Sequence, residues 1–408
     1  MLLDIAWEWL AFAVKWAHVV AGIAWIGTSF YFIALDLGLR TAPNMPKGVR
    51  GEEWQVHGGG FYHVRKYMIA PPGMPEHLTW FKWESYATWL SGAALLGVMY
   101  YAGAELYLID HERMPLSAGV AIALSAGSLA VGWILYDQIC KSPLGRNDIT
   151  LMLVLYALIV VMGWAYAQVF TGRAALLHLG AFTATIMTAN VAMIIMPNQR
   201  KAVADLKADR TPPANLGAQA KQRSLHNNYL TLPVIFLMLS NHYPLAFAST
   251  FNWLIAALVF LLGVLIRYYF NTYHAHKGVR LWPWAASVAL LGVMGWLSTL
   301  HPAAPSDAFD VDEARASSSS PFLAHADFEA AYDIVLARCA MCHAAEPAWA
   351  DMPVAPKAVM LETPAQVAQH ARAIYLHSAL TRAMPPGNLT YMEPEERATL
   401  RRWYEDAR

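Results

Sequence analysis

Long apolar runs separated by short polar segments dominate the first three hundred positions. Stretches free of Asp, Glu, Lys and Arg cover 16–35, 85–104, 114–136, 149–172, 174–199, 224–266 and 281–306. A helix needs about 20 apolar residues to cross a bilayer core, because no water there satisfies the backbone. The longest stretch contains Asn241-His242-Tyr243-Pro244, which is typical of an interfacial turn. The pattern predicts eight spans, at 9–37, 84–104, 116–139, 150–170, 174–196, 226–242, 249–272 and 281–300.

The pattern changes after residue 300. Residues 301–321 are rich in Ser, Ala, Pro and acidic groups, which is typical of a flexible linker. Residues 322–408 are polar, with amphipathic helices predicted near Phe328–Val335 and over Glu393–Arg408. The sequence therefore predicts an all-α protein with a transmembrane bundle of about eight spans over 1–300 and a small soluble domain over 322–408.

Composition and charge agree with this division. The chain is 57% hydrophobic and only 14% charged, and it has three cysteines. These values exclude a disordered chain, a coiled coil and a disulfide scaffold. Residues 1–300 have a net charge of +6 and residues 301–408 one of −6, so one part suits lipid and the other water. No nucleic-acid partner is expected.

The distribution of positive charge predicts the orientation. Loops after the odd-numbered spans hold 16 lysines and arginines, whereas loops after spans 2, 4 and 6 hold only Arg113 and Arg173. Basic loops stay in the cytoplasm, so both termini are expected in the periplasm of a bacterial inner membrane. No cleaved signal peptide is expected before the first span, since Asp4 and Glu8 stand where a basic segment would be.

The soluble domain contains Cys339-Ala-Met-Cys342-His343. Two thiols at this spacing reach the vinyl groups of one haem, and the adjacent histidine becomes an axial iron ligand. A thioredoxin-like pair or half a zinc site shares the C-x-x-C spacing, but the histidine disfavours the first and the lack of a second cysteine pair the second. The domain length and flanking helices predict a class I cytochrome c with one covalent haem c.

The second axial ligand should lie on a loop before the last helix. Met384 occupies such a loop, followed by Pro385 and Pro386, which keep the backbone out of a helix. Met392 is the rival ligand, and ordinary packing is the alternative role for Met384. Haem c is attached outside the bacterial cytoplasm, in agreement with the orientation from charge. Cys140 is expected to be a free buried thiol.

Polar groups in or beside the bilayer are costly and mark functional sites. An inner group comprises Glu84, His226, Asn227, Asn228, Arg267, Asn271 and His274, with Phe61, Arg65, Trp80 and Trp83 in or beside the long first loop. An outer group comprises His18, His178 and His242. Each has a structural alternative: charges anchor helix ends, the loop glycines serve a turn, Asn227 and Asn228 cap a span, tryptophans form interfacial belts, and histidines join helices.

Long segments of the chain resemble the membrane-integral, cytochrome-c-linked urate oxidases (urate hydroxylases) of bacterial purine catabolism. The resemblance rests on GGGFYHVRKYMIAPPGMPEHLTWFKWESYATW (58–89), HLGAFTATIMTANVAMIIMPNQRK (178–201), HNNYLTLPVIFLMLSNHYP (226–244) and the CAMCH motif. It implies an eight-helix domain that oxidises urate to 5-hydroxyisourate, a periplasmic cytochrome c, and no release of hydrogen peroxide. A downstream acceptor such as a cytochrome c oxidase would take the electrons.

Urate chemistry suggests roles for the inner group. Urate is a planar anion, so Arg65 or Arg267 is expected to pair with it and Asn227 or Asn228 to bond its edge. Trp80, Trp83 or Phe61 is expected to stack on its face, and Glu84 or His226 is the candidate general base. Rival interpretations are a membrane dehydrogenase for quinol or another purine, and a non-catalytic haem electron carrier.

A second cofactor is a further hypothesis. A substrate near the cytoplasm would lie about 30 Å from a periplasmic haem, the thickness of the bilayer core. The segment 16–30 is similar to the histidine-bearing first helix of membrane b-haem proteins, including the membrane protoporphyrinogen oxidases. His18 and His178 are therefore candidate axial ligands of a haem b, with a structural role as the alternative.

Overall fold

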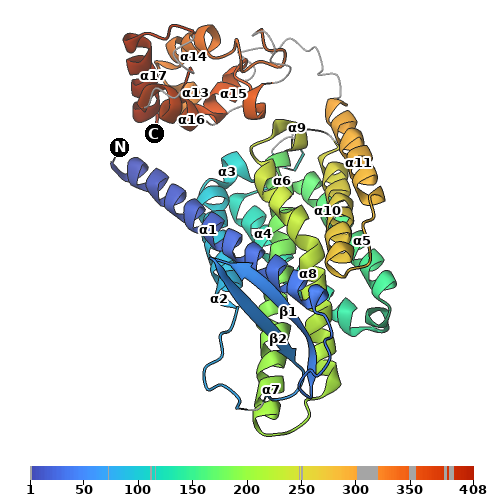
Figure 1. Cartoon of the computed structure of the whole chain (residues 1–408). Helices are drawn as coiled ribbons and strands as arrows, with labels where there is room; N and C mark the ends of the chain where they lie inside the picture. The colour runs from blue at the N-terminus through green and yellow to red at the C-terminus, as the bar shows by residue number, and fades with distance from the viewer. Residues whose placement is uncertain are drawn as a thin grey trace. The chain divides into compact units, whose positions relative to one another are not determined.

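The computed structural model describes residues 2–71, 73–110, 113–114, 116–247, 249, 251–300, 320–348, 355–380, 384–385 and 390–408. The chain forms two compact units (Figure 1). The first covers Met1–Asn241 and Leu245–Leu300, and the second comprises His242–Pro244 and the chain from His301, of which residues 320 onwards are described with the gaps given above. Residues 301–319 of the predicted linker lie outside the described residues, and Pro321 begins a short helix.

The first unit is a helical bundle with a β-hairpin after its first helix. Its main helices are α1 (Leu2–Gly38), α2 (Trp83–Leu96), α4 (Ala118–Lys141), α5 (Asp148–Val169), α6 (Gly172–Ala189), α7 (Met196–Lys207), α8 (Ala214–Ser240), α10 (Asn252–His274) and α11 (Trp282–Thr299). Short helices α3 (Ala104–Tyr107) and α9 (Pro244–Phe247) connect them. The 3-10 turn η2 (Pro143–Arg146) joins α4 to α5.

Two π-helical turns interrupt this regular pattern. η1 (Gly97–Tyr101) continues α2, and η3 (Asn190–Ile195) joins α6 to α7. A π turn shifts the helix register, so it re-aims the side chains around it and is frequent at functional sites. Asn190, the first residue of η3, is fully buried and points into the bundle's polar interior.

Helices are present at all eight positions where spans were predicted. Within the described residues, five helical segments are long and apolar enough to cross a membrane: Ile5–Gly38, Ala118–Lys141, Asp148–Val169, Gly172–Lys207 and Asn252–His274. These five are consistent with membrane association, and the count of eight spans stays a prediction. Large apolar side chains on outward helix faces are exposed, as expected for surfaces that contact lipid: Trp9, Phe12, Trp16, Val131, Ile134, Val161, Val288 and Trp296.

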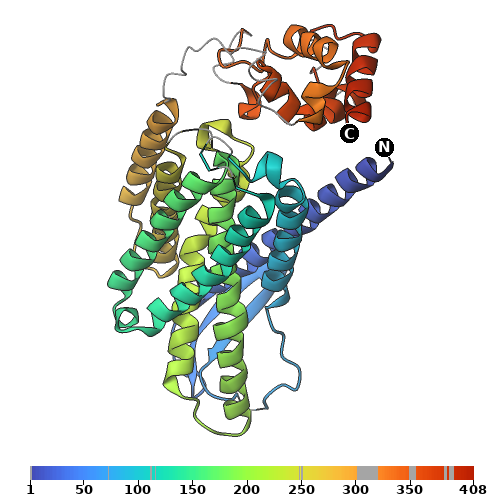
Figure 2. The same cartoon turned by 180° about the vertical axis from the view of Figure 1, so that it is seen from behind.

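The helices pack closely where one side contributes a glycine. A Cβ on Gly132 of α4 would lie 2.0 Å from the Phe182 ring of α6, and one on Gly263 of α10 would lie 2.5 Å from Pro233 of α8. Small residues of this kind allow close approach between helices in membranes. α6, α8 and α10 thus lie side by side at the centre of the unit (Figures 1 and 2).

The first loop differs from the all-α prediction, because it folds into an antiparallel hairpin, β1 (Val49–His57) and β2 (Gly60–Tyr67). Gly58 and Gly59 have φ of 61° and 77°, which a two-residue hairpin turn of this kind requires. Trp54 stacks on its cross-strand partner His63 with ring centroids 4.1 Å apart. Cross-strand pairs of this type stabilise a hairpin that a helix-period pattern does not reveal.

The second unit is a small helical domain. It contains α13 (Pro321–Ala324), α14 (Phe328–Arg338), the 3-10 turn η4 (Pro356–Ala358), α15 (Pro364–Gln369), α16 (Ala371–Ile374), the π turn η5 (Tyr375–Leu380) and α17 (Pro394–Asp406). α14 packs on α17, with the Phe328 and Trp403 rings 6.0 Å apart and Arg338 paired to Glu396 at 2.9 Å. Trp403 is fully buried at the centre of this core.

Candidate functional site

Helix contacts bring several predicted site residues to one level of the first unit. Asn228 Nδ2 donates to Asn271 Oδ1 at 3.2 Å, and Arg267 donates to the same oxygen at 3.1 Å. The Arg267 guanidinium also lies over the Phe30 ring of α1, 4.1 Å from its centroid. Asn228, Arg267 and Asn271 are all buried. The structure therefore joins three predicted polar residues of α8 and α10 to an aromatic ring that was not predicted from the sequence.

α2 and α6 contribute polar groups at this level. Trp89 Nε1 donates to Thr185 Oγ1 at 3.1 Å, and the Tyr100 and His178 rings lie 5.9 Å apart, so the helices run antiparallel. Ser85 lies one turn from Trp89, and Thr188 lies one turn from Thr185. Helical periodicity therefore puts Ser85 and Thr188 on the helix faces that carry the α2–α6 contact.

The depth of Glu84 follows from the packing of α2 on α1. Phe81 contacts Phe32 with ring centroids 4.7 Å apart, and His18 bonds the Thr88 carbonyl at 3.0 Å. Glu84 lies between these two contacts, and thus within about two helical turns of the level of Phe30 on α1.

These residues share unusual polar atoms. Within the described residues, the buried atoms Glu84 Oε2, Ser85 Oγ, Thr188 Oγ1, Asn228 Oδ1 and Arg267 Nε have no hydrogen-bond partner. Buried polar atoms without partners are rare and cost about 1–3 kcal/mol each. We call the set Glu84, Ser85, Thr188, Asn228, Arg267 and Asn271 the polar layer. Its open donors and acceptors are candidate contacts for a small polar molecule.

Charge strengthens this interpretation. Arg267 is buried, with 5% of the residue's surface exposed. Among the described residues, no carboxylate pairs with it. Arg223, the other buried arginine, is paired to Asp137 at 2.8 Å. A buried cation is normally paired, so Arg267 is suited to an anionic ligand.

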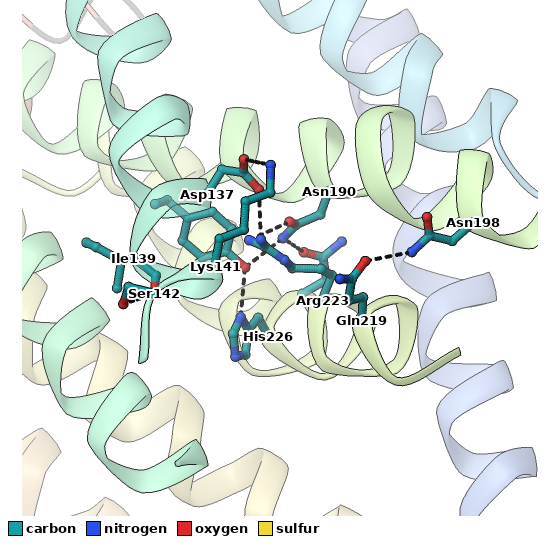
Figure 3. A network of polar contacts seen from close by, with 11 residues as sticks. Asp137, Ile139, Lys141, Ser142, Asn190, Asn198, Gln219, Arg223 and His226 are labelled. Atoms are coloured by element: carbon teal, nitrogen blue, oxygen red, sulfur yellow. Dashed lines mark hydrogen bonds and ion pairs between the residues drawn. The ribbon is translucent and has the colours of Figure 1, made fainter. Parts of the chain in front are cut away.

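His226 and Asn227 belong to a second buried network on another side of α8 (Figure 3). His226 Nδ1 lies 2.7 Å from the Tyr136 hydroxyl, and Asn227 bonds the Met187 carbonyl and the Asn190 side chain. The sequence placed Asn227 and Asn228 at the start of a span, where they could cap it. This alternative is wrong, because α8 begins at Ala214 and both asparagines are in its interior.

The residues of the first loop lie elsewhere. Arg65 is on β2 and pairs with the Glu52 carboxylate at 2.9 Å, and this hydrogen bond, followed by that of His63, holds the pKa of Glu52 below its usual value. Phe61 is 78% exposed beside the hairpin turn, and Trp83 is 65% exposed at the start of α2. Trp80 precedes α2 and is half-buried. None of these four is buried with the polar layer.

The two candidate haem b ligands contact different helices. His18 Nδ1 lies 3.0 Å from the Thr88 carbonyl on α2. His178 is fully buried, with Nδ1 bonded to the Ala174 carbonyl and Nε2 to Ser125 Oγ, both at 2.7 Å. Iron ligation by His178 would displace Ser125, so haem b stays a prediction.

The second unit places the Cys339-Ala-Met-Cys342-His343 motif at the end of α14. Cys339 is the C-terminal cap of that helix, and burial raises the pKa of its thiol to about 12. His343 Nδ1 donates to the Val359 carbonyl at 2.8 Å, which leaves Nε2 with a free lone pair for iron. Cys339, Cys342 and His343 thus fit a covalently attached haem. Met392 is buried in the core and Met384 is half-buried in its loop.

Fold and site together define a helical protein with membrane-length helices and buried polar residues between them. A family model described as Urate oxidase N-terminal matches residues 4–298. The chain therefore belongs to the urate oxidase N-terminal family, whose match covers nearly all of the helical bundle. Neither a curated protein nor a solved structure matches the chain.

Proposed function

We propose that the first unit oxidises urate to 5-hydroxyisourate and that the second unit accepts the electrons through one covalent haem c. The proposal rests on the burial of Arg267 among unpartnered polar atoms, without a carboxylate partner in the described part of the chain. The family of the chain supports it. Urate supplies the missing anion and a ring of carbonyl and N–H groups. The same layer also supplies amides and hydroxyls for its edges.

The roles follow from the donors and acceptors on each side chain. Arg267 pairs with the urate anion, and its guanidinium is held over Phe30 by stacking. Asn271 Oδ1 already accepts two hydrogen bonds, so its Nδ2 is a donor for the substrate. Asn228 Oδ1 is an acceptor for a urate N–H. Glu84 has one carboxylate oxygen without a partner and is one candidate general base; His226 is the other.

The reaction balances without oxygen. Urate and water give 5-hydroxyisourate, two protons and two electrons. Water forms the new C5–O bond, so no peroxide is produced. When bound, the haem of the second unit accepts one electron at a time. Cys339 and Cys342 would hold this haem, with His343 and Met384 as axial ligands.

Orientation and partners complete the proposal. The protein lies in a bacterial inner membrane, with its basic loops facing the cytoplasm. Both termini face the periplasm, where haem c is attached. Electrons then pass to a periplasmic or respiratory acceptor such as a cytochrome c oxidase.

Anaerobic titration of the purified full-length protein with urate tests this function. We expect reduction of the haem bands at about half a urate per haem c, because urate supplies two electrons and one haem takes one. A peroxide assay in the presence of an acceptor is expected to be negative. Haem reduction by quinol but not by urate would assign the protein to another dehydrogenase class, and no reduction by either would leave an electron carrier.

A further inference from the structure

The second buried network contains a chain of hydrogen bonds that begins at a fixed donor (Figure 3). Arg223 is held by Asp137 at 2.8 Å, and Asp137 is also paired to Lys141 at 2.5 Å. The other arm of the guanidinium donates to Asn190 Oδ1 at 3.5 Å. A guanidinium has only donors, so it can bond only the carbonyl oxygen of the Asn190 amide.

A second anchor fixes the same amide from its other end. Asn227 Nδ2 donates to the Met187 carbonyl at 2.9 Å, which can only accept. Asn227 Oδ1 therefore faces Asn190 and accepts from its Nδ2 at 3.0 Å. Two independent groups thus orient the Asn190 amide, and the second hydrogen of Nδ2 is donated to the Tyr136 hydroxyl at 2.9 Å.

The Tyr136 hydroxyl must then direct its own hydrogen elsewhere. Its oxygen accepts from Asn190 Nδ2 at 2.9 Å, and the Arg223 guanidinium lies over the Tyr136 ring, 4.8 Å from its centroid. Among the described residues, the acceptor within hydrogen-bond distance of this hydroxyl is His226 Nδ1, at 2.7 Å. The hydroxyl therefore donates to His226 Nδ1. This assigns the ring hydrogen of a neutral His226 to Nε2.

We infer that Arg223, Asn190 and Tyr136 are positioning residues that hold His226 as the neutral Nε2–H tautomer. His226 then offers a donor and has no accessible lone pair for a proton. Its role in catalysis rests on the proposed function: His226 is excluded as the general base of urate oxidation, and of the two candidates Glu84 remains. Among the described residues the Tyr136 hydroxyl is the only hydrogen-bond partner of His226, so Nε2–H has no competing acceptor.

Nitrogen NMR of the full-length protein tests the tautomer without any assay of activity. Histidine labelled with 15N at Nδ1 reports whether that nitrogen carries hydrogen, and the spectrum of His226→Gln identifies the His226 signal by its loss. We expect an unprotonated, hydrogen-bonded Nδ1 in the wild type. Asn190→Asp should move the signal to the protonated range. The introduced carboxylate accepts the Tyr136 hydrogen, so the Tyr136 oxygen then accepts a hydrogen bond from His226 Nδ1–H.

Two further variants keep this test decisive. Tyr136→Phe removes the donor and should shift the His226 signal even if Asn190→Asp fails to fold. Tyr166→Phe is the matched control, because it removes another buried tyrosine hydroxyl, bonded to Ser128 at 2.7 Å, and should leave the His226 signal unchanged. A protonated Nδ1 in the wild type, or one signal shared by the wild type and Tyr136→Phe, would overturn the inference.

Kinetics test the role itself. His226→Gln keeps an N–H donor but cannot act as a base, so we expect kcat with urate to fall less than about tenfold, whereas loss of a general base costs about 10²–10⁴-fold. The low-pH limb of the kcat profile should remain in this variant. A loss above 10²-fold together with loss of that limb would restore His226 as the base. If urate does not reduce the haem of the wild-type protein, the proposed function is refuted, whereas the NMR result still stands.

Discussion

At the scale of single residues, two candidate arginines differ in burial: Arg267 lies in the bundle interior and Arg65 lies at the surface. Both were candidates for pairing with urate, yet Arg65 is already paired to Glu52 on an exposed hairpin. Arg267 is buried over Phe30 without a carboxylate among the described residues. Burial strengthens a charged hydrogen bond because solvent does not screen it, so the two arginines should respond differently to substitution.

We therefore expect Arg267→Ala to lower kcat/KM for urate by at least about tenfold, the loss of a hydrogen bond to a charged group. Arg65→Ala should change it by no more than about fivefold, the scale of an exposed ion pair. Stopped-flow reduction of haem at several urate concentrations measures both. Equal losses would contradict the assignment of the anion site to the polar layer.

The unpartnered hydroxyls of Ser85 and Thr188 make a second prediction. A buried hydroxyl without a partner destabilises the free protein, so Ser85→Ala and Thr188→Val should leave thermal stability unchanged or raise it by about 1 kcal/mol. If these hydroxyls bind substrate, each variant should also weaken urate binding severalfold. A fall in stability with unchanged binding would show that they serve packing alone. Thermal unfolding with and without urate measures both effects.

Much of the polar layer could be selected from sequence, because charges and amides are conspicuous in apolar runs. Glu84, Asn228 and Arg267 were found in this way. Ser85, Thr188 and Phe30 were not, since a hydroxyl or a phenyl ring in a span is ordinary. Tyr136, Asn190 and Arg223 are far apart in the chain, and only helix packing brings them together. The pairing of Asp137 with Arg223, opposite charges beside two spans, was the one available signal.

At the scale of elements, the positions of helices followed the apolar runs, but their lengths did not. α8 begins at Ala214, twelve residues before the predicted span, because its polar first half is a good helix sequence outside the bilayer pattern. The hairpin was missed because its alternating positions lie in a segment interpreted as a binding loop. Apolarity predicts where a helix crosses lipid and gives no information on where it continues into water.

Close packing of α4 on α6 predicts a sharp difference between two glycines of one helix. A Cβ on Gly132 would lie 2.0 Å from the Phe182 ring, whereas a Cβ on Gly127 meets nothing within 4 Å. Gly132→Ala should therefore destabilise the bundle by about 1–3 kcal/mol through overpacking. Gly127→Ala, on an exposed face of α4, should have no such cost. Thermal unfolding in detergent compares them, and equal midpoints would refute the close contact.

The hairpin predicts a dependence on pH. Arg65 and His63 hold the pKa of Glu52 below its usual 4.5, so the ionised carboxylate stabilises the folded hairpin. This stabilisation is present above pH 4.5 and is lost as the pH falls through the lowered pKa of the folded state. Glu52→Gln should thus lower the unfolding midpoint at pH 7, and this difference should shrink as the pH falls below 4.5. A constant difference between variant and wild type would contradict this coupling.

At the scale of the whole molecule, the chain divides into two units with different chemistry. The first holds the polar layer and belongs to the urate oxidase N-terminal family, and the second has its own core around Trp403. Urate binding and electron acceptance should therefore be separable by substitution. Both units belong to one chain. In the proposed function, the electron acceptor is therefore present at a high effective concentration near the substrate site.

Cys339→Ala with Cys342→Ala separates the two functions. Without both thiols no covalent haem c can form, so the denatured protein should show no bound haem, and urate should reduce nothing. The polar layer is unchanged, so urate should still quench tryptophan fluorescence and raise the unfolding midpoint of the bundle. Arg267→Ala should show the reverse, with covalent haem present and urate binding weakened. Loss of urate binding in the double cysteine variant would mean that the substrate site depends on the second unit, contrary to a site built from α1, α2, α6, α8 and α10.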